Sequence, residues 1–87
     1  MANQMLNVRI VTPKAVVYQG TALSISSTNS AGKFDILPQH ANFITIVEHS
    51  PITIRMEKKR RLTFNFLVAI ISNMKNKVNI YTDISIK

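Results

Sequence analysis

The chain has 87 residues, with 11 Lys and Arg against 4 Asp and Glu, a formal net charge of +7, and no cysteine. This length predicts one small domain over residues 1–87, and the lack of cysteine excludes disulfide bonds and thiolate metal sites. The longest uninterrupted apolar run, residues 66–71, is far shorter than the roughly 20 residues that cross a bilayer as a helix. Residues 1–5 also lack the basic and then apolar pattern of a secretory signal.

In chain order, most apolar segments repeat with a period of two, which predicts β-strands that each have one buried face. The alternation runs through residues 6–10, 23–26, 52–57, 62–66 and 78–81. Residues 67–71 are apolar at both parities, which is typical of a strand covered on both sides or of an interface strand. No segment shows the period and the capping signals of an amphipathic helix.

Turn-forming residues separate these segments at short intervals. They lie at 12–14, 19–20, 28–32, 38–40, 49–51, 58–61 and 73–76. About eight to ten short strands in a chain of this length indicate an all-β fold, a flattened β-sandwich or barrel with up-and-down and Greek-key connections.

The residues that could carry chemistry do not form a recognisable site. His40 and His49 have only Asp35 and Glu48 nearby in the sequence, and this is not a three- or four-ligand metal set. Gly32 and the lysine after it lack the remaining residues of a phosphate-binding loop, and no Gly-x-Ser-x-Gly elbow occurs. The sequence therefore predicts a protein that is not an enzyme and has no catalytic residue, metal or cofactor.

The strongest charge cluster of the chain consists of Lys58, Lys59, Arg60 and Arg61. Such a cluster favours anionic partners, namely nucleic acid, an acidic protein face or a phospholipid surface. The simpler interpretation is a solvated hairpin tip that keeps a sheet edge from pairing with its neighbours. An alternative function is a small basic β-barrel that binds single-stranded nucleic acid. Such barrels need several exposed aromatic rings, for which only Tyr18 and Tyr81 are candidates.

Residues 32–45 read Gly-Lys-Phe-Asp-Ile-Leu-Pro-Gln-His-Ala-Asn-Phe-Ile-Thr, which predicts a strand, a corner at a proline and a second strand. This order of residues resembles the central motif of the epsilon subunit of F-type ATP synthase, called delta in mitochondria. In that family the motif typically reads Gly-Glu-Phe-Gly-Ile-Leu-Pro-Gly-His-Ala-Pro-Leu-Ile-Thr. Residues 6–13 and 17–20 are similar to the opening strand and first turn of the family, and residues 78–83 to its last strand. Lys33 and Gln39 depart from the motif, where the family has Glu and Gly.

The resemblance implies the N-terminal β-sandwich domain of that subunit, without the helical hairpin that usually follows it. It implies a non-catalytic subunit in the central stalk of the rotary, proton-translocating ATP synthase, which links gamma to the membrane c-ring and couples rotation to ATP synthesis. Such a subunit is peripheral to the cytoplasmic face of the bacterial inner membrane. By position in the motif, the c-ring loops are expected to meet Gly32, Lys33 and Phe34, and gamma is expected to meet Thr12, His40 and Thr45. In this setting, a weak contact with the anionic membrane surface is expected from Lys58, Lys59, Arg60 and Arg61.

Overall fold

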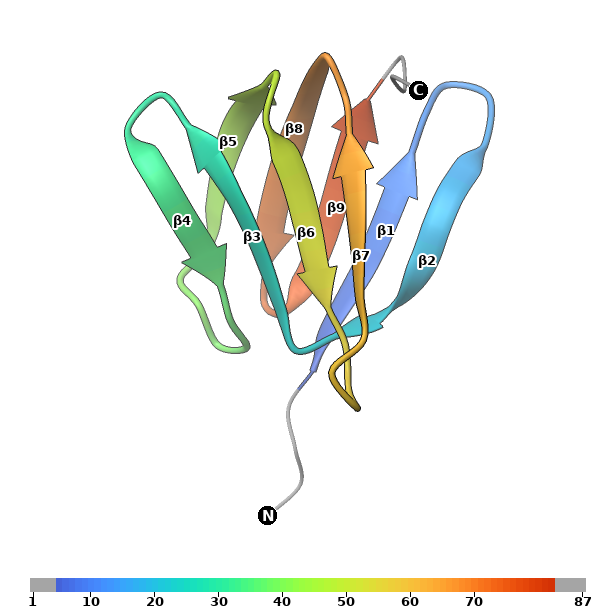
Figure 1. Cartoon of the computed structure of the whole chain (residues 1–87), viewed down its shortest axis with the longest axis vertical. Helices are drawn as coiled ribbons and strands as arrows, with labels where there is room; N and C mark the ends of the chain where they lie inside the picture. Colours follow the sequence, from blue (N-terminus) through green and yellow to red (C-terminus); the bar gives the residue numbers. More distant parts are fainter. Residues whose placement is uncertain (1–4, 83–87) are drawn as a thin grey trace.

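The computed structural model describes residues 5–82, which form nine β-strands in two sheets packed face to face (Figure 1). Since these residues contain only strands and their connections, they include no helix that could cross a membrane, and the all-β sandwich prediction is confirmed. The predicted last strand ran to Asp83, which lies outside the described residues, as do residues 1–4 of the expected N-terminal segment. The strands are β1 (Leu6–Val11), β2 (Val16–Ala22), β3 (Ser24–Asn29), β4 (Gly32–Ile36), β5 (Phe43–Glu48), β6 (Pro51–Arg55), β7 (Arg61–Asn65), β8 (Val68–Met74) and β9 (Lys77–Thr82).

The larger sheet has the strand order β2-β1-β9-β8-β5, and the smaller sheet has the order β4-β3-β6-β7. Neighbouring strands are antiparallel except β1 and β9, which run parallel with Ile10 opposite Ile80. Edge strands β4 and β5 lie on one side of the sandwich, where the rings of Phe34 and Phe43 pack 5.9 Å apart. Edge strands β2 and β7 lie on the other side, where Tyr18 and Phe64 pack at the same centroid distance of 5.9 Å.

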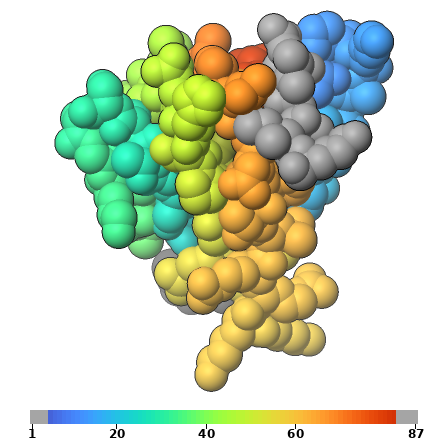
Figure 2. All heavy atoms as spheres, turned by 45° about the horizontal axis from the view of Figure 1, so that its top comes forward, coloured from blue at the N-terminus to red at the C-terminus, as the bar shows by residue number. Residues whose placement is uncertain are grey.

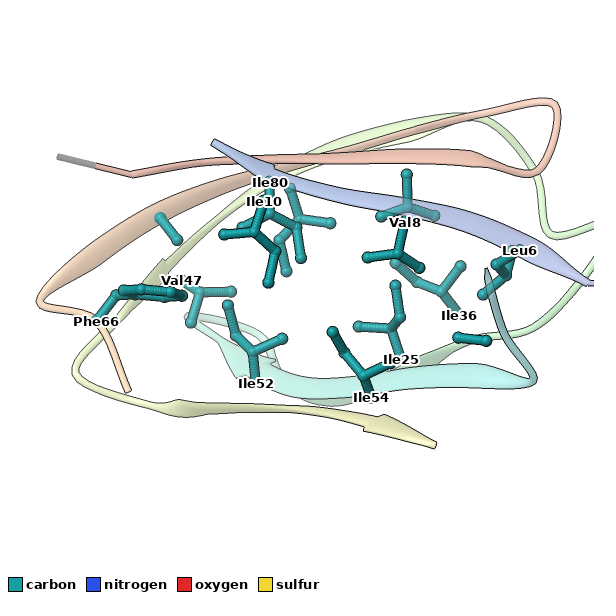
Figure 3. Close-up of a cluster of buried hydrophobic side chains, with 14 residues drawn as sticks. Leu6, Val8, Ile10, Ile25, Ile36, Val47, Ile52, Ile54, Phe66 and Ile80 are labelled. Carbon is teal, nitrogen blue, oxygen red and sulfur yellow. The ribbon is translucent and has the colours of Figure 1, made fainter. Parts of the chain in front are cut away.

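The core lies between the two sheets and is built mainly from branched aliphatic side chains (Figure 3). The alternation in the sequence holds along β1, where Asn7 and Arg9 are exposed and the even-numbered residues 6, 8 and 10 are buried. Isoleucine and valine suit this core because their branched Cβ atoms favour strands and pack well on a pleated surface. The buried hydrophobic residues are Leu6, Val8, Ile10, Ala22, Ile25, Ile36, Val47, Ile52, Ile54, Phe66, Ala69, Ile71, Val78 and Ile80.

Several tight turns adopt left-handed backbone conformations without glycine. In the two-residue turn between β8 and β9, Lys75 and Asn76 have φ of 51° and 68°. Such turns favour Asn-Gly, because each ordinary L-residue in this region costs about 1–2 kcal/mol. Gln39, with a φ of 70°, stands where the family motif has glycine. The chain therefore keeps the backbone conformation of the motif although the glycine is replaced.

We expect Gln39→Gly to raise the free energy of unfolding by about 1 kcal/mol, because glycine relieves the left-handed strain at a modest entropic cost. The hydrogen bond from the Gln39 backbone N to Asn76 Oδ1, 2.6 Å long, does not depend on the side chain that is removed. Urea unfolding followed by circular dichroism measures the change. Gln19→Gly, at an exposed position within β2, is the matched control and should lower stability by about 1 kcal/mol. A comparable loss in both variants would contradict the assignment of strain to position 39.

Candidate protein-binding surface

The outward-facing sides of the two sheets differ in chemistry. In the smaller sheet, the outward positions are polar, and they pair across the strands, with Thr53 opposite Thr63 and Ser26 opposite Asp35. The two threonine hydroxyls lie 3.3 Å apart, and the Ser26 hydroxyl donates a hydrogen bond to the Asp35 carboxylate. This face is therefore suited to contact with water, as expected for an antiparallel sheet with one solvated side.

The outward side of the larger sheet carries a contiguous apolar surface instead. Ile46 of β5 lies opposite Ile70 of β8, which lies opposite Tyr81 of β9, which in turn lies opposite Val11 of β1. This row crosses four neighbouring strands. Exposed fractions are 56% for Ile46, 40% for Ile70 and 47% for Tyr81. Together with two flanking residues, the row forms what we call the apolar outer face: Val11, Ile44, Ile46, Val68, Ile70 and Tyr81.

A hollow of about 490 Å³ extends this face towards the turn between β1 and β2. Its lining is mostly apolar and includes Val68, Ile70 and Tyr81 of the apolar outer face, together with Thr12. The Thr12 hydroxyl accepts hydrogen bonds from the backbone N–H groups of residues 14 and 15, at 3.2 and 3.1 Å, and so closes the turn. Thr12 therefore borders the apolar outer face while its hydroxyl is engaged within the chain.

The other two residues expected at gamma, His40 and Thr45, lie near the β4–β5 edge. The His40 ring packs on Phe43 with the ring centroids 4.9 Å apart, and its Nδ1 lies 2.8 Å from the carbonyl oxygen of Ala41. Thr45 points to the same side of β5 as the core, and its Oγ1 accepts a 2.9 Å hydrogen bond from Asn29 Nδ2. The structure thus brings these two residues near one edge, whereas Thr12 lies beyond β8 and β9 from them.

The corner that carries His40 is fixed by a buried asparagine on β8. Asn73 is 0% exposed, and its Nδ2 donates to the carbonyl oxygens of His40 and Ala41 at 3.4 and 3.2 Å. Its Oδ1 is buried without a hydrogen-bond partner. Burial of an amide in an apolar core is costly unless it is hydrogen-bonded, so these two bonds specify where the corner sits against β8.

The residues expected at the c-ring form the start of β4, next to the turn between β3 and β4. Gly32 has a φ of 122°, a conformation that L-residues rarely adopt, and Lys33 is exposed. Phe34 is half-buried and packs at right angles to the ring of Phe43. Gly32 and Lys33 are therefore accessible to a partner, while Phe34 packs behind them and stabilises the turn.

The basic residues 58–61 lie at the opposite end of the sandwich. Strands β3 and β7 run towards the end with the β3–β4 turn, and strand β6 runs towards the end with the β6–β7 turn (Figure 1). Lys58 and Lys59 occupy this turn with φ of 62° and 60°, and Arg61 begins β7. The interpretation as a hairpin tip is therefore confirmed. The residues expected at the c-ring and those expected at the membrane surface lie at opposite ends of the sandwich.

The residues of the apolar outer face were largely missed from the sequence, although signals for them exist. The apolar run at residues 67–71 predicts a strand covered on both sides or an interface strand. Coverage on both sides is wrong within this chain, because Val68 and Ile70 are exposed. Residues 43–47 of β5 are also apolar at both parities except at Thr45, and this signal points to Ile44 and Ile46. Among residues 5–82, no group of His, Asp and Glu could hold a metal ion.

A β-sandwich of a five-stranded and a four-stranded sheet, with one parallel pair, β1 and β9, inside the larger sheet, defines the structural class of this chain. Residues 5–87 match the family described as the ATP synthase delta/epsilon chain, β-sandwich domain. The chain therefore belongs to the ATP synthase delta/epsilon family, which confirms the resemblance.

Individual relatives agree with this family assignment. The ATP synthase epsilon chain of Sulfurimonas denitrificans is 39% identical over 54 residues, which are 62% of this chain and 42% of the relative. That of Nitratiruptor sp. is 30% identical over 63 residues, 70% of this chain and 49% of the relative. The matched part thus spans less than half the length of these relatives.

Solved structures share the fold at low sequence identity. A chain in the cryo-EM structure of the Euglena gracilis mitochondrial ATP synthase, OSCP/F1/c-ring, superposes with a TM-score of 0.85 and 12% identity, covering 98% of this chain and 56% of that one. A chain from the central stalk/c-ring structure of the Tetrahymena thermophila mitochondrial ATP synthase superposes with a TM-score of 0.77 and 15% identity, covering 100% of this chain and 69% of that one.

Proposed function

We propose that this chain is a non-catalytic epsilon-type subunit in the central stalk of a rotary ATP synthase, where it links gamma to the c-ring and so couples rotation to ATP synthesis. The family assignment and the relatives named ATP synthase epsilon chain support this role. In a bacterium, the subunit would be a peripheral component at the cytoplasmic face of the inner membrane.

The observation that carries the proposal is the apolar outer face. Contiguous exposed apolar residues on an otherwise polar protein mark a contact with another protein, because their burial removes apolar area from water at about 25 cal/mol per Å². The outward side of the smaller sheet lacks such residues, so the larger sheet is the side assigned to gamma. Thr12 borders this surface, while His40 and Thr45 would contribute from its β5 margin.

The c-ring is assigned to the end of the sandwich with the β3–β4 turn, through Gly32 and Lys33, with Phe34 as internal support. Lys33 carries the opposite charge to the acidic residue typical of the motif, so we propose that the c-subunit loop from the same source carries a compensating acidic residue. The basic turn 58–61 lies at the far end. If the end with the β3–β4 turn faces the c-ring, the end with the β6–β7 turn faces away from the membrane. The expected weak contact of residues 58–61 with the membrane surface is therefore incompatible with this assignment.

The test is capture of gamma from the same source by this chain, with a single-stranded oligonucleotide as a parallel bait. Apolar contacts are not screened by salt, so gamma should be retained at both about 50 and about 300 mM salt. Oligonucleotide bound only through surface charge should be lost at the higher concentration. Retention of the oligonucleotide without capture of gamma would contradict the proposal.

The alternative of single-stranded nucleic acid binding is not supported. Of the two candidate stacking residues, Tyr18 is half-buried against Phe64, and its hydroxyl donates a hydrogen bond to the sulfur of Met56 at 3.6 Å. Tyr81 belongs to the apolar outer face of the larger sheet, whereas the charge cluster lies at the turn between β6 and β7 of the smaller sheet. Charge without a row of stacking rings gives only salt-sensitive, non-specific binding.

A further inference from the structure

The turn between β6 and β7 concentrates positive charge in a way that the proposed function does not use. Residues 55–61 include one acidic residue, Glu57, and five exposed cationic residues. In Figure 2 the gold side chains of this segment stand clear of the body of the molecule. The cationic residues are Arg55, Lys58, Lys59, Arg60 and Arg61.

Two features of this turn oppose folding of the free chain. Arg55 lies directly opposite Arg61 in the β6–β7 pairing, and like charges in such a pair repel each other. Lys58 and Lys59 both have a left-handed backbone, at φ of 62° and 60°, in a turn for which Asn-Gly would be the favourable sequence. A left-handed backbone without glycine also occurs between β8 and β9, so the pairing of two arginines is the feature that distinguishes the β6–β7 turn.

The same residues surround a hollow of about 290 Å³. Its lining consists of Arg55, Lys59, Arg60 and Arg61 together with the apolar Leu23 and Met56. Guanidinium groups match the two oxygens of a carboxylate, and apolar side chains match the methylene groups of glutamate. The hollow thus has the chemistry to receive an acidic side chain.

We infer that the β6–β7 turn is a docking site for an acidic segment of a protein partner, one with several neighbouring Glu or Asp residues. A lipid surface fits less well, because residues 57–61 contain no apolar or aromatic side chain that could enter a bilayer interface. The turn also lies at the end of the sandwich away from the proposed c-ring contact, and therefore away from the membrane; this point against a lipid surface rests on the proposed function. Nucleic acid fits less well because the turn has no aromatic ring for base stacking.

The test measures binding of fluorescein-labelled hexaglutamate to the full chain by fluorescence anisotropy at about 50 mM salt. The variant Lys58→Asn with Lys59→Gly removes two charges and also relieves the left-handed strain. It should bind the peptide roughly tenfold more weakly, while its melting temperature rises by about 4 °C or more. Loss of binding together with a gain in stability cannot arise from misfolding.

The matched control is Arg9→Gln with Lys14→Gln, which removes the same charge from β1 and from the β1–β2 turn. Its affinity for the peptide should stay within about twofold of the unmodified chain, since these charges are distant from the turn. Equal weakening in both variants, or none in the turn variant, would overturn the inference. Tighter binding to phosphatidylserine vesicles, or to a thymidine oligonucleotide, than to the peptide would also overturn it. Since the assay contains no gamma, its outcome is independent of the capture experiment.

Discussion

Replacing Asn73 by aspartate is expected to lower the free energy of unfolding by about 3 to 5 kcal/mol at neutral pH. Asn73 is fully buried, and its Nδ2 donates to two carbonyl oxygens of the corner at residues 40 and 41. The variant removes both donors and places a carboxylate against the same two oxygens. The corner that carries His40 would therefore lose its attachment to β8, and the buried charge would have no compensating partner.

The loss should depend on pH with a defined sign. Burial and the facing carbonyl oxygens are expected to raise the pKa of the new carboxyl group above its value in the unfolded chain. Well below about pH 4, the carboxyl group is protonated in both states and its single O–H can replace one of the two lost donors, so the loss of stability should shrink to about 1 kcal/mol. Stability then falls as the pH rises through the window from about 4 to the raised pKa of the folded state.

Urea unfolding between about pH 4 and 8 measures this profile, and it remains measurable at low pH even if the variant does not fold at neutral pH. Asn65→Asp, at an exposed position on β7, is the matched control and should change stability by less than about 0.5 kcal/mol at any pH in this range. If the Asn73 variant showed a loss independent of pH, the buried carboxyl group would not be its cause.

The strands could be predicted from the sequence because their signals are local. Alternation of Leu6, Val8 and Ile10 with polar residues predicts one buried face without knowledge of any partner strand. The pairing of the strands is not a local property. In the β1–β9 pair, Asn7 lies opposite Lys77, and no pattern in either segment specifies this neighbour.

The direction in which functional side chains point was the less predictable part. The family motif places Phe34 at the tip, yet its side chain packs inward on Phe43. The reason is that Phe34 lies two residues before the buried Ile36 on β4 and so faces the same side of the sheet. Thr45 likewise faces Asn29, while the neighbouring Ile44 and Ile46 face outward. The sequence signal for the apolar outer face is a segment that is apolar at both alternating positions. That Ile46, Ile70 and Tyr81 are neighbours follows only from the order of the strands in the sheet.

A charge pair introduced into the apolar outer face should abolish capture of gamma without unfolding the chain. In the variant Ile46→Lys with Ile70→Glu, the two new charges lie directly opposite each other on β5 and β8. Opposite charges in such a pair are compatible with the sheet, and both positions are exposed in the free chain. Contact with gamma would take both charges out of water, so the dissociation constant is expected to rise by at least about 100-fold.

The most direct test of the assigned surface is therefore the dissociation constant for gamma, measured at about 300 mM salt for this variant and for a matched one. Thr53→Lys with Thr63→Glu introduces the same two charges at a directly opposite pair on the polar outer side of the smaller sheet. We predict that gamma binding is lost in the Ile46 and Ile70 variant and is unchanged in the Thr53 and Thr63 variant, with both chains folded. The reverse result, or equal binding by both variants, would contradict the assignment of gamma to the apolar outer face.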